Sequence, residues 1–363
     1  MIEDLGVPVH CVVGTSMGAI VAGLYGAGYD AADMRELFSD VNWGEIITGH
    51  GGYRDRSFRD KELSERYFSD YVAGFDESGL RLPGGYQSLR KMRLFLRDHT
   101  TDVADIHDFD DMPTPFRTVG TDLNDFSGVT LGEGDLVEAM LASMAVPGVY
   151  PAIEYHGKVL IDGGMSKQVA IDVIREMGAD VVIVIDTTIL PPQFDATPNL
   201  AATIQQMIQV TVWKNWKEQI ALLQPGDVHI QPDLTDLSSS NFDVIALGYQ
   251  RGVDKAREFE SQLLAIKAQA APPTRFKPAR NKSFAIADIT VADSAGVNAD
   301  LIERRAAIDV GDEVTAADLE QGIKNVEALG AFGEVDYVLA PYAGGEQLTI
   351  KTTPRSLGRN LLQ

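Results

Sequence analysis

The sequence contains very little cysteine and a deficit of basic residues. Cys11 is its single cysteine, which excludes an internal disulfide and fits either a cytosolic protein or a bacterial envelope protein without disulfides. Lysine and arginine number 31 against 53 acidic residues, which gives a net charge of −22. This charge argues against broad nucleic-acid binding, which needs a basic surface. Attachment to anionic lipid would need a local basic patch or apolar contacts.

Long hydrophobic runs and nucleotide or metal motifs are also missing. No apolar run reaches the length of a membrane-spanning helix, and the first residues do not resemble a signal peptide. The chain has no dinucleotide-binding fingerprint, no P-loop and no cysteine–histidine metal pattern. The acidic stretch 105–112 lacks the spacing of a calcium loop and indicates a solvated turn.

Short apolar runs alternate with helix-like segments over the first 270 residues. The 363 residues suffice for about two domains, and hydrophobic residues make up 45% of them. Alternating strands and helices indicate a parallel sheet with helices on both faces. We expect strands at 9–13, 116–123, 181–186 and 227–234, and helices at 16–26, 173–180, 198–224 and 244–268.

A change of composition divides the chain. Residues 271–282 are rich in proline and basic residues, as linkers often are. Residues 283–354 then predict the order strand, helix, helix, strand, strand, which is enough for a small α+β domain. We therefore expect a first domain at 1–270, a linker at 271–282 and a second domain at 283–354.

The segment Gly14-Thr15-Ser16-Met17-Gly18 fits the G-x-S-x-G pattern of a hydrolase nucleophile turn. An apolar strand precedes it and a helix of small residues follows, which is the context that gives the pattern meaning. In such a turn the serine is strained and exposed, and Gly14 and Gly18 avoid collisions in the bend. The helix N-terminus beside Ser16 would favour a developing oxyanion. An ordinary strand-to-helix turn is the alternative interpretation.

A serine nucleophile needs a base, and the sequence offers two candidates. His229 follows an acidic residue in the chain order of α/β-hydrolases, but it lies in a strand-like run, where a structural histidine is the simpler interpretation. The other candidate is Asp162, which an apolar strand delivers into Gly163-Gly164. An aspartate can act without histidine if desolvation raises its pKa.

The two motifs together resemble the patatin-like phospholipase family. The likeness extends to ASMAVPGVYPAIEYHGKVLIDGG (142–164) and MGADVVIVID (177–186), and it spans nearly all of residues 5–260. The resemblance implies a three-layer α/β/α sandwich with a mostly parallel sheet. It further implies a Ser16–Asp162 dyad that hydrolyses acyl esters of phospholipids or other lipids at a membrane surface through an acyl-serine intermediate. No metal and no organic cofactor is implied, and a homodimer is allowed.

The chain departs from the family pattern at its start. Family members carry a glycine-rich loop whose backbone N–H groups form the oxyanion hole, whereas this sequence begins near the end of the helix that follows that loop. The expectation is a domain truncated at its N-terminus, in which the N–H of Met17 is the one oxyanion donor that can be named. Lost donors cost about 10²–10³ in rate each. The alternative function is a catalytically impaired fragment that acts through its second domain.

Residues 283–354 resemble a POTRA domain, mainly through 307–339. The final segment, 355–363, resembles the lead-in to the outer-membrane barrel of secreted bacterial patatins of type V. The resemblance therefore implies a location in the bacterial cell envelope, at the outer membrane or secreted. A generic α+β interaction domain is the other interpretation.

Two segments carry clustered basic residues, 53–67 and 88–100. In the second, one helical face is apolar and the others are basic. The apolar face carries Leu89, Met92, Phe95 and Leu96, and the others carry Arg90, Lys91, Arg93 and Arg97. One hypothesis makes this helix a lid that settles on lipid headgroups near the site. The other makes it a helix that covers the core and keeps its arginines in solvent.

Overall fold

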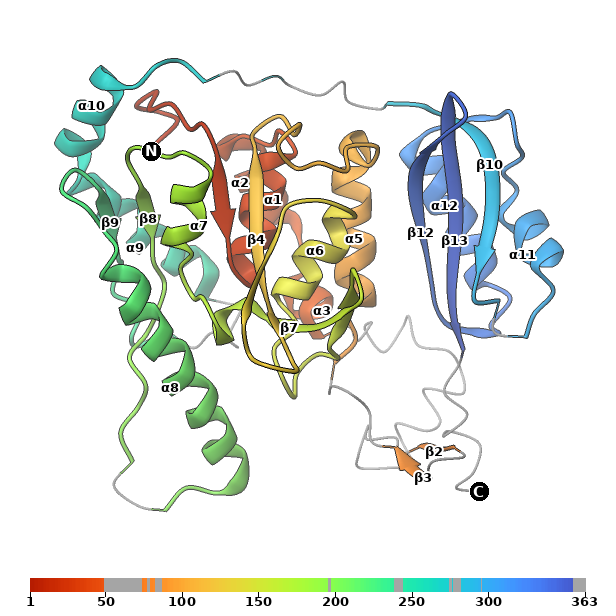
Figure 1. Cartoon of the computed structure of the whole chain (residues 1–363), viewed down its shortest axis with the longest axis horizontal. Coiled ribbons are helices and arrows are strands. Elements are labelled where there is room, and N and C mark those ends of the chain that lie inside the picture. Colours follow the sequence, from red (N-terminus) through yellow and green to blue (C-terminus); the bar gives the residue numbers. More distant parts are fainter. Residues whose placement is uncertain are drawn as a thin grey trace.

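The structure is a computed structural model, which describes residues 1–48, 74–76, 79–81, 87–194, 197–237, 244–273, 276, 282–294 and 296–354. Figure 1 shows an N-terminal α/β domain and a smaller C-terminal module, drawn in blue. The basic segment 53–67, most of the expected linker and the segment 355–363 lie outside the described residues. Among the described residues, no helix combines the length and apolarity needed to cross a bilayer.

The N-terminal domain begins with the strand and helix that flank Ser16. Its elements in chain order are β1 (Val12–Gly14), α1 (Met17–Gly26), α2 (Ala31–Asp40), α3 (Trp43–Thr48), β2 (Gly74–Asp76), β3 (Gly79–Arg81), α5 (Arg90–Thr100), η1 (Thr101–Val103), β4 (Phe116–Asp122), β5 (Gly128–Leu131), α6 (Leu136–Ser143), β6 (Ile153–Tyr155), β7 (Lys158–Asp162), η2 (Gly163–Met165), α7 (Ile171–Glu176), β8 (Ile183–Ile185), α8 (Leu200–Ile220), β9 (Val228–Ile230), α9 (Ile245–Arg257) and α10 (Glu260–Gln269). The single helix expected at 244–268 is thus two helices.

The main sheet is not mostly parallel, which corrects the expectation. Its order is β1-β4-β7-β6, with β5 also paired to β4. Among the described strands of this sheet, only the β1–β4 pairing is parallel, and the β4–β5, β4–β7 and β6–β7 pairings are antiparallel. A second sheet pairs β8 with β9 in parallel. The domain is therefore mixed α/β, with two parallel pairings in the part that the structure describes.

Tight turns explain the antiparallel pairs. The β6–β7 hairpin closes through His156 and Gly157, whose φ angles are 49° and 75°. Two positive φ values in a two-residue loop match the twist of a hairpin. The β4–β5 hairpin turns at 123–127, where Phe126 also has a positive φ of 60°. Alternation of apolar segments alone does not distinguish such hairpins from crossovers.

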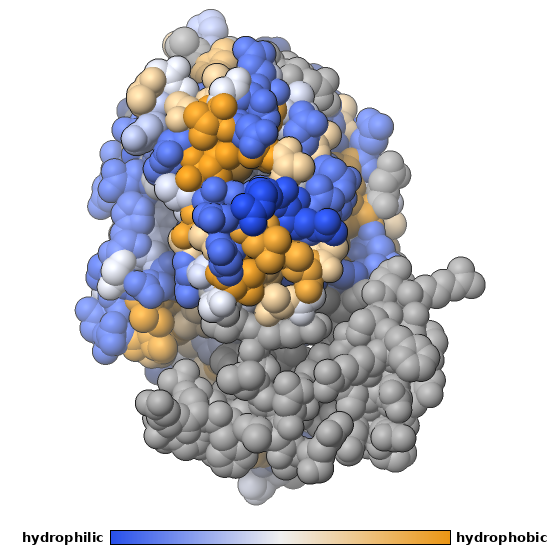
Figure 2. Space-filling view, turned by 90° about the vertical axis from the view of Figure 1, so that its right-hand side faces the viewer, coloured by the Kyte–Doolittle hydropathy of each residue, from blue (hydrophilic) through white to orange (hydrophobic). Residues whose placement is uncertain are grey.

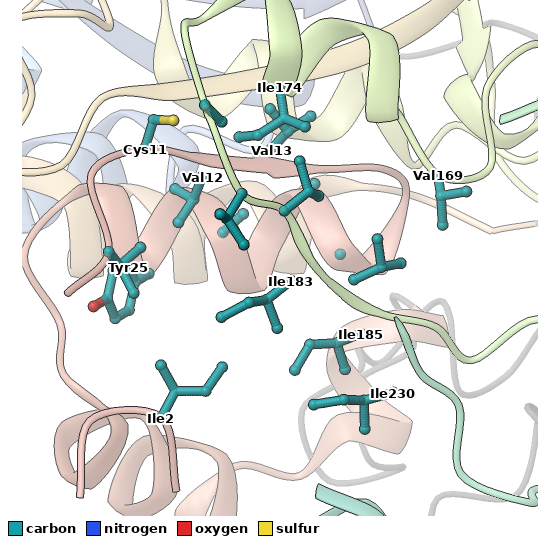
Figure 3. A pocket seen from close by; sticks show the side chains of 18 of the residues that line it. Ile2, Cys11, Val12, Val13, Tyr25, Val169, Ile174, Ile183, Ile185 and Ile230 are labelled. Atoms are coloured by element: carbon teal, nitrogen blue, oxygen red, sulfur yellow. The ribbon is translucent and has the colours of Figure 1, made fainter. Parts of the chain in front are cut away.

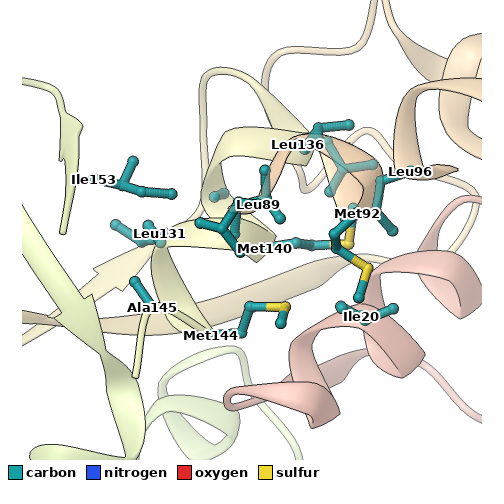
Figure 4. Packing of buried hydrophobic residues seen from close by; sticks show 14 of the residues in the cluster. Ile20, Leu89, Met92, Leu96, Leu131, Leu136, Met140, Met144, Ala145 and Ile153 are labelled. Atoms are coloured by element: carbon teal, nitrogen blue, oxygen red, sulfur yellow. The ribbon is translucent and has the colours of Figure 1, made fainter. Parts of the chain in front are cut away.

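Helices cover both faces of the main sheet. On one face, α1, α5 and α6 pack against β4 and β7 in the largest hydrophobic cluster. Figure 4 shows Ile20, Met92 and Met140 meeting there at the centre of the cluster. On the other face, Val173 of α7 packs on Val119 of β4. This layering holds the C-terminal end of β1, and Ser16 after it, between helices.

The C-terminal module has its elements in the order that the sequence predicts, with one short additional strand. They are β10 (Phe284–Ala292), α11 (Ala299–Ala306), β11 (Glu313–Val314), α12 (Ala316–Glu327), β12 (Phe332–Tyr342) and β13 (Gly345–Pro354). The sheet order is β11-β10-β13-β12, and α11 and α12 pack on it around a separate core. The face of the molecule in Figure 2 carries apolar patches separated by a hydrophilic band.

Helix α5 joins the module to the N-terminal domain. It covers the core through the buried side chains of Leu89, Met92 and Leu96, as the second hypothesis has it. The expectation that its arginines stay in solvent is wrong for Arg93 and Arg97. Arg97 is buried, and its guanidinium donates to Asp336 of β12 at 3.0 and 3.2 Å and to Asp135 at 2.9 Å. Arg93 pairs with Glu138 at 2.6 Å and also with Glu334 of β12. These side chains are therefore committed to acidic partners, and they are not available to lipid headgroups.

We expect Arg97→Ala to lower the free energy of unfolding by about 3–5 kcal/mol, because it leaves Asp135 and Asp336 buried without their cation. Denaturant unfolding measures this change. Arg257→Ala is the control, because the Arg257 side chain is 63% exposed in its pair with Asp254. That substitution should cost less than about 1 kcal/mol. Equal losses in the two variants would contradict a structural role for the buried pairs.

Candidate active site

The segment between β1 and α1 is a strained, tight turn. Ser16 has φ 56° and ψ −126°, a backbone conformation that side-chain-bearing residues rarely adopt. A Cβ atom on Gly14 would lie 2.0 Å from the carbonyl oxygen of Gly18, so only glycine fits at position 14. A Cβ on Gly18 would meet nothing within 4 Å. The expectation that Gly18 is also needed to avoid a collision is therefore wrong.

The structure brings Ser16 and Asp162 together. The hydroxyl of Ser16 donates a hydrogen bond of 2.6 Å to Oδ2 of Asp162. The other carboxylate oxygen accepts from the backbone N–H of Gly164 at 2.7 Å. A Cβ on Gly163 would lie 2.0 Å from the carbonyl oxygen of Val119, so the turn after Asp162 also requires glycine. Two glycine turns thus hold the hydroxyl against the carboxylate.

Burial sets the protonation of Asp162. The side chain is 6% exposed. Desolvation raises the pKa of Asp162 to about 6, although the hydrogen bonds from Ser16 and Gly164 act in the opposite direction. A carboxylate with this pKa is ionised at neutral pH, yet it is more basic than an exposed aspartate. It can accept the proton of Ser16 without a histidine.

Ser143, at the end of α6, is a site residue that sequence reasoning missed. Its buried hydroxyl oxygen accepts the backbone N–H of Ser16 at 2.9 Å. The N–H of Gly18 donates to the carbonyl of Thr15, whereas the N–H of Met17 has no acceptor among the residues that the structure describes. Met17 therefore offers a free donor at the turn. Ser143 lies in the quoted stretch 142–164, but nothing in its local pattern indicates this contact.

Helix α8 supports the turn that carries Asp162. The side chain of Asn215 donates to the carbonyl of Gly164 at 2.7 Å and accepts the N–H of Gln168 at 2.7 Å. One turn further on, Gln219 accepts the N–H groups of Ile171 and Asp172 at the start of α7. These contacts fix the segment that follows Asp162, and the sequence offered no sign of them.

His229 is hydrogen-bonded to a different aspartate, Asp186. Its Nε2 is 2.8 Å from Oδ2 of the buried Asp186, which also accepts from the indole N–H of Trp216 at 2.7 Å. The partner of the Ser16 hydroxyl is Asp162. The structure thus gives His229 a role in joining β8, β9 and α8. Among the described residues, no group of three or more His, Cys, Asp or Glu side chains is arranged to hold a metal ion.

A cavity of about 2200 Å³ adjoins the turn. Figure 3 shows Val12 and Val13 of β1 on one side of it and Ile183 and Ile185 of β8 on the other. Within the described residues, β1 pairs only with β4, and β8 pairs only with β9. The cavity therefore separates two strand edges and reaches Met17 at the start of α1.

A strained serine between a strand and a helix, hydrogen-bonded to a buried aspartate, is the arrangement of an α/β domain with a hydrolase-type nucleophile turn. The sequence model of the patatin-like phospholipase family matches residues 2–174, which include both side chains. This part of the chain belongs to the patatin-like phospholipase family.

Similar curated proteins come from mycobacteria and yeasts. An uncharacterised NTE family protein of Mycobacterium tuberculosis (strain H37Rv) is 26% identical over 213 residues, which cover 58% of this chain and 50% of that protein. Lysophospholipase NTE1 of Saccharomyces cerevisiae is 20% identical over 72% of this chain and 15% of that protein. The chain thus spans about half the length of the mycobacterial relative and a small part of the yeast one.

One solved structure resembles a part of the chain only weakly. It is titled POTRA1-2 of the periplasmic domain of Omp85 from Anabaena, and it covers 21% of this chain and 48% of its own chain. The sequence identity is 15% and the TM-score is 0.19, which is too low to support an argument about fold.

We expect Asp162→Asn to stabilise the fold in a pH-dependent way. The pKa of Asp162 lies near 6 in the folded protein and near 3.8 in the unfolded chain. The native state therefore binds more protons between these values and loses stability as pH rises through them. The gain in the free energy of unfolding from Asp162→Asn should reach its full value above about pH 6 and should vanish below about pH 4. Its full value is at most about 3 kcal/mol. Denaturant unfolding across this range measures it, and a pH-independent gain would contradict the raised pKa.

Proposed function

We propose that the N-terminal domain is a lipid acyl hydrolase, a serine esterase of the phospholipase A or lysophospholipase type, that uses Ser16 and Asp162 as a catalytic dyad. The observation that carries this proposal is the 2.6 Å hydrogen bond from a strained serine to a buried aspartate with a pKa of about 6. Its position between β1 and the N-terminus of α1 adds a dipole that favours negative charge.

The geometry supports a two-step reaction. Oγ of Ser16 attacks the carbonyl carbon of an ester while its proton passes to Oδ2 of Asp162. The alcohol leaves with that proton when the ester bond breaks, and the acyl group stays on Ser16. Asp162 then takes a proton from water, which attacks the acyl carbon, and the acid leaves as Ser16 regains its proton. The free N–H of Met17 is the donor available to the oxyanion.

A lipid is the substrate class that fits best. Apolar side chains of β1, β8 and α7 line part of the adjacent cavity, which reaches the nucleophile turn. Such a cavity can take a fatty acyl chain. The relative from Saccharomyces cerevisiae is named a lysophospholipase, which agrees with this class of substrate.

We expect a fluorophosphonate probe to label the wild-type chain and to fail with Ser16→Ala. Hydrolysis of a short soluble ester should fall at least about 10³-fold in Asp162→Asn, because the base is lost. The acid limb of kcat/KM in the wild type should lie near pH 6, where the carboxylate becomes ionised.

The control separates Asp162 from His229. His229→Ala should retain turnover, because the partner of the Ser16 hydroxyl is Asp162. Loss of turnover in His229→Ala together with a folded near-wild-type spectrum would instead favour a Ser-Asp-His mechanism.

A second candidate function follows from the scarcity of oxyanion donors. The backbone N–H of Ser16 already donates to the hydroxyl oxygen of Ser143. Among the described residues, Met17 alone therefore offers a free N–H at this turn. Under this alternative the chain is catalytically impaired and acts by binding through a POTRA-type module. Absence of labelling in a folded sample would favour it. A location in the bacterial cell envelope and a homodimer also stay predictions.

A further inference from the structure

Helix α8 and the segment before it form an arm that projects from the N-terminal domain. We define the α8 arm as residues 187–194 and 197–213. In Figure 1 the N-terminal half of α8 extends beyond the sheet and its other helices. The side chain of Gln206 donates to the carbonyl of Pro192 at 2.9 Å, which ties the two halves of the arm together. The two halves of the arm are therefore in contact.

Large apolar side chains are exposed along this arm. The most exposed are Leu200 at 77%, Leu190 at 66% and Met207 at 66%. Ile204, Phe194 and Ile189 are 50, 46 and 40% exposed. So many apolar side chains in one projection exceed the scattered exposure that is normal for a soluble protein, and such a concentration marks a contact surface.

The arm is also nearly free of charge. Residues 187–213 contain one charged residue, Asp195, in a chain with 31 basic and 53 acidic residues. Charges return abruptly at the root of the arm, where the sequence reads Trp213-Lys214-Asn215-Trp216-Lys217. Nζ of Lys217 lies 3.8 Å from the centroid of the Trp213 ring. Tryptophan and lysine next to an uncharged apolar segment are typical of a membrane interface, where ammonium groups meet lipid phosphates.

The root of the arm adjoins the candidate active site. Asn215, between the two tryptophans, donates to the carbonyl of Gly164, and Gly164 donates its N–H to Asp162. A surface that meets the arm as far as its root would therefore lie close to the Ser16–Asp162 pair.

We infer that the α8 arm docks the protein onto a zwitterionic phospholipid surface, with its apolar part among the acyl chains and Lys214 and Lys217 at the phosphates. This inference rests on the proposed lipid hydrolysis, for which it supplies access to the substrate. The net charge of −22 opposes both a second copy and a strongly anionic bilayer as the occupant. Lys214 and Lys217, which are both exposed, match the headgroup layer.

Flotation with phosphatidylcholine vesicles tests the docking. The arm variant combines Leu190→Ser, Leu200→Ser and Met207→Ser, and its partition coefficient should fall at least about tenfold. The matched control combines Leu264→Ser, Leu301→Ser and Val310→Ser, whose parent side chains are 43, 42 and 61% exposed outside the arm. Its partition should equal that of the wild type. Equal partition of the arm variant and the control variant would overturn the inference.

Depth and activity measurements separate the two proposals. Headgroup-proximal brominated lipid should quench the wild-type tryptophan fluorescence through Trp213 and Trp216, because Trp43 is buried in the core. The arm variant should keep wild-type turnover of a soluble ester and lose turnover of vesicle lipid.

Wild-type protein that hydrolyses the soluble ester without binding vesicles would overturn the docking alone. Vesicle binding without turnover of any ester would overturn the proposed function alone. A dimer that dissociates in the arm variant, together with no vesicle binding, would assign the arm to a second copy and overturn the docking.

Discussion

Strand β4 is the constraint on which the Ser16–Asp162 hydrogen bond depends. It pairs with β1 in parallel and with β7 in the opposite direction, with Gly14 opposite Thr118 and Asp162 opposite Gly120. The strands that lead to the two catalytic candidates thus flank β4, and Gly14 and Asp162 lie opposite β4 residues that are two positions apart. The hydroxyl of Thr118 donates to the carbonyl of Gly14, which fixes this register from the side chains as well. The antiparallel direction of β7 is therefore what presents Asp162 to Ser16.

The same geometry ties the basicity of Asp162 to a cost in stability. Backbone packs tightly at both turns, because a Cβ atom added to Gly14 or Gly163 would lie 2.0 Å from a carbonyl oxygen. This packing excludes water from the carboxylate, so that its pKa rises to about 6. A more exposed Asp162 would stabilise the fold at neutral pH and would be a weaker base for Ser16. Strain at Ser16 and desolvation at Asp162 are thus two results of one close packing arrangement.

The sequence predicts the parts of this structure that short segments determine. Ser16 and Asp162 each lie in a glycine turn after an apolar strand, so both could be chosen, and the order of elements at 283–354 was also legible. The relative directions of the strands could not be predicted, because in sequence the His156-Gly157 hairpin turn resembles any other polar segment between two apolar ones. Arg93 and Arg97 each have a partner on β12, more than 200 residues away. Such pairs become visible only when tertiary structure brings the two elements together.

Helix α8 shows a further reason why local patterns fall short. Tests for amphipathic helices compare one face with another, whereas α8 differs along its length. Its C-terminal half carries Asn215 and Gln219, which hold the turn after Asp162 and the start of α7. Its N-terminal half exposes Leu200 and Met207 and has no charge. An average of hydrophobicity over the whole helix therefore hides the difference between the apolar half and the polar half. One rigid element can therefore position the candidate base at one end and meet a lipid surface at the other.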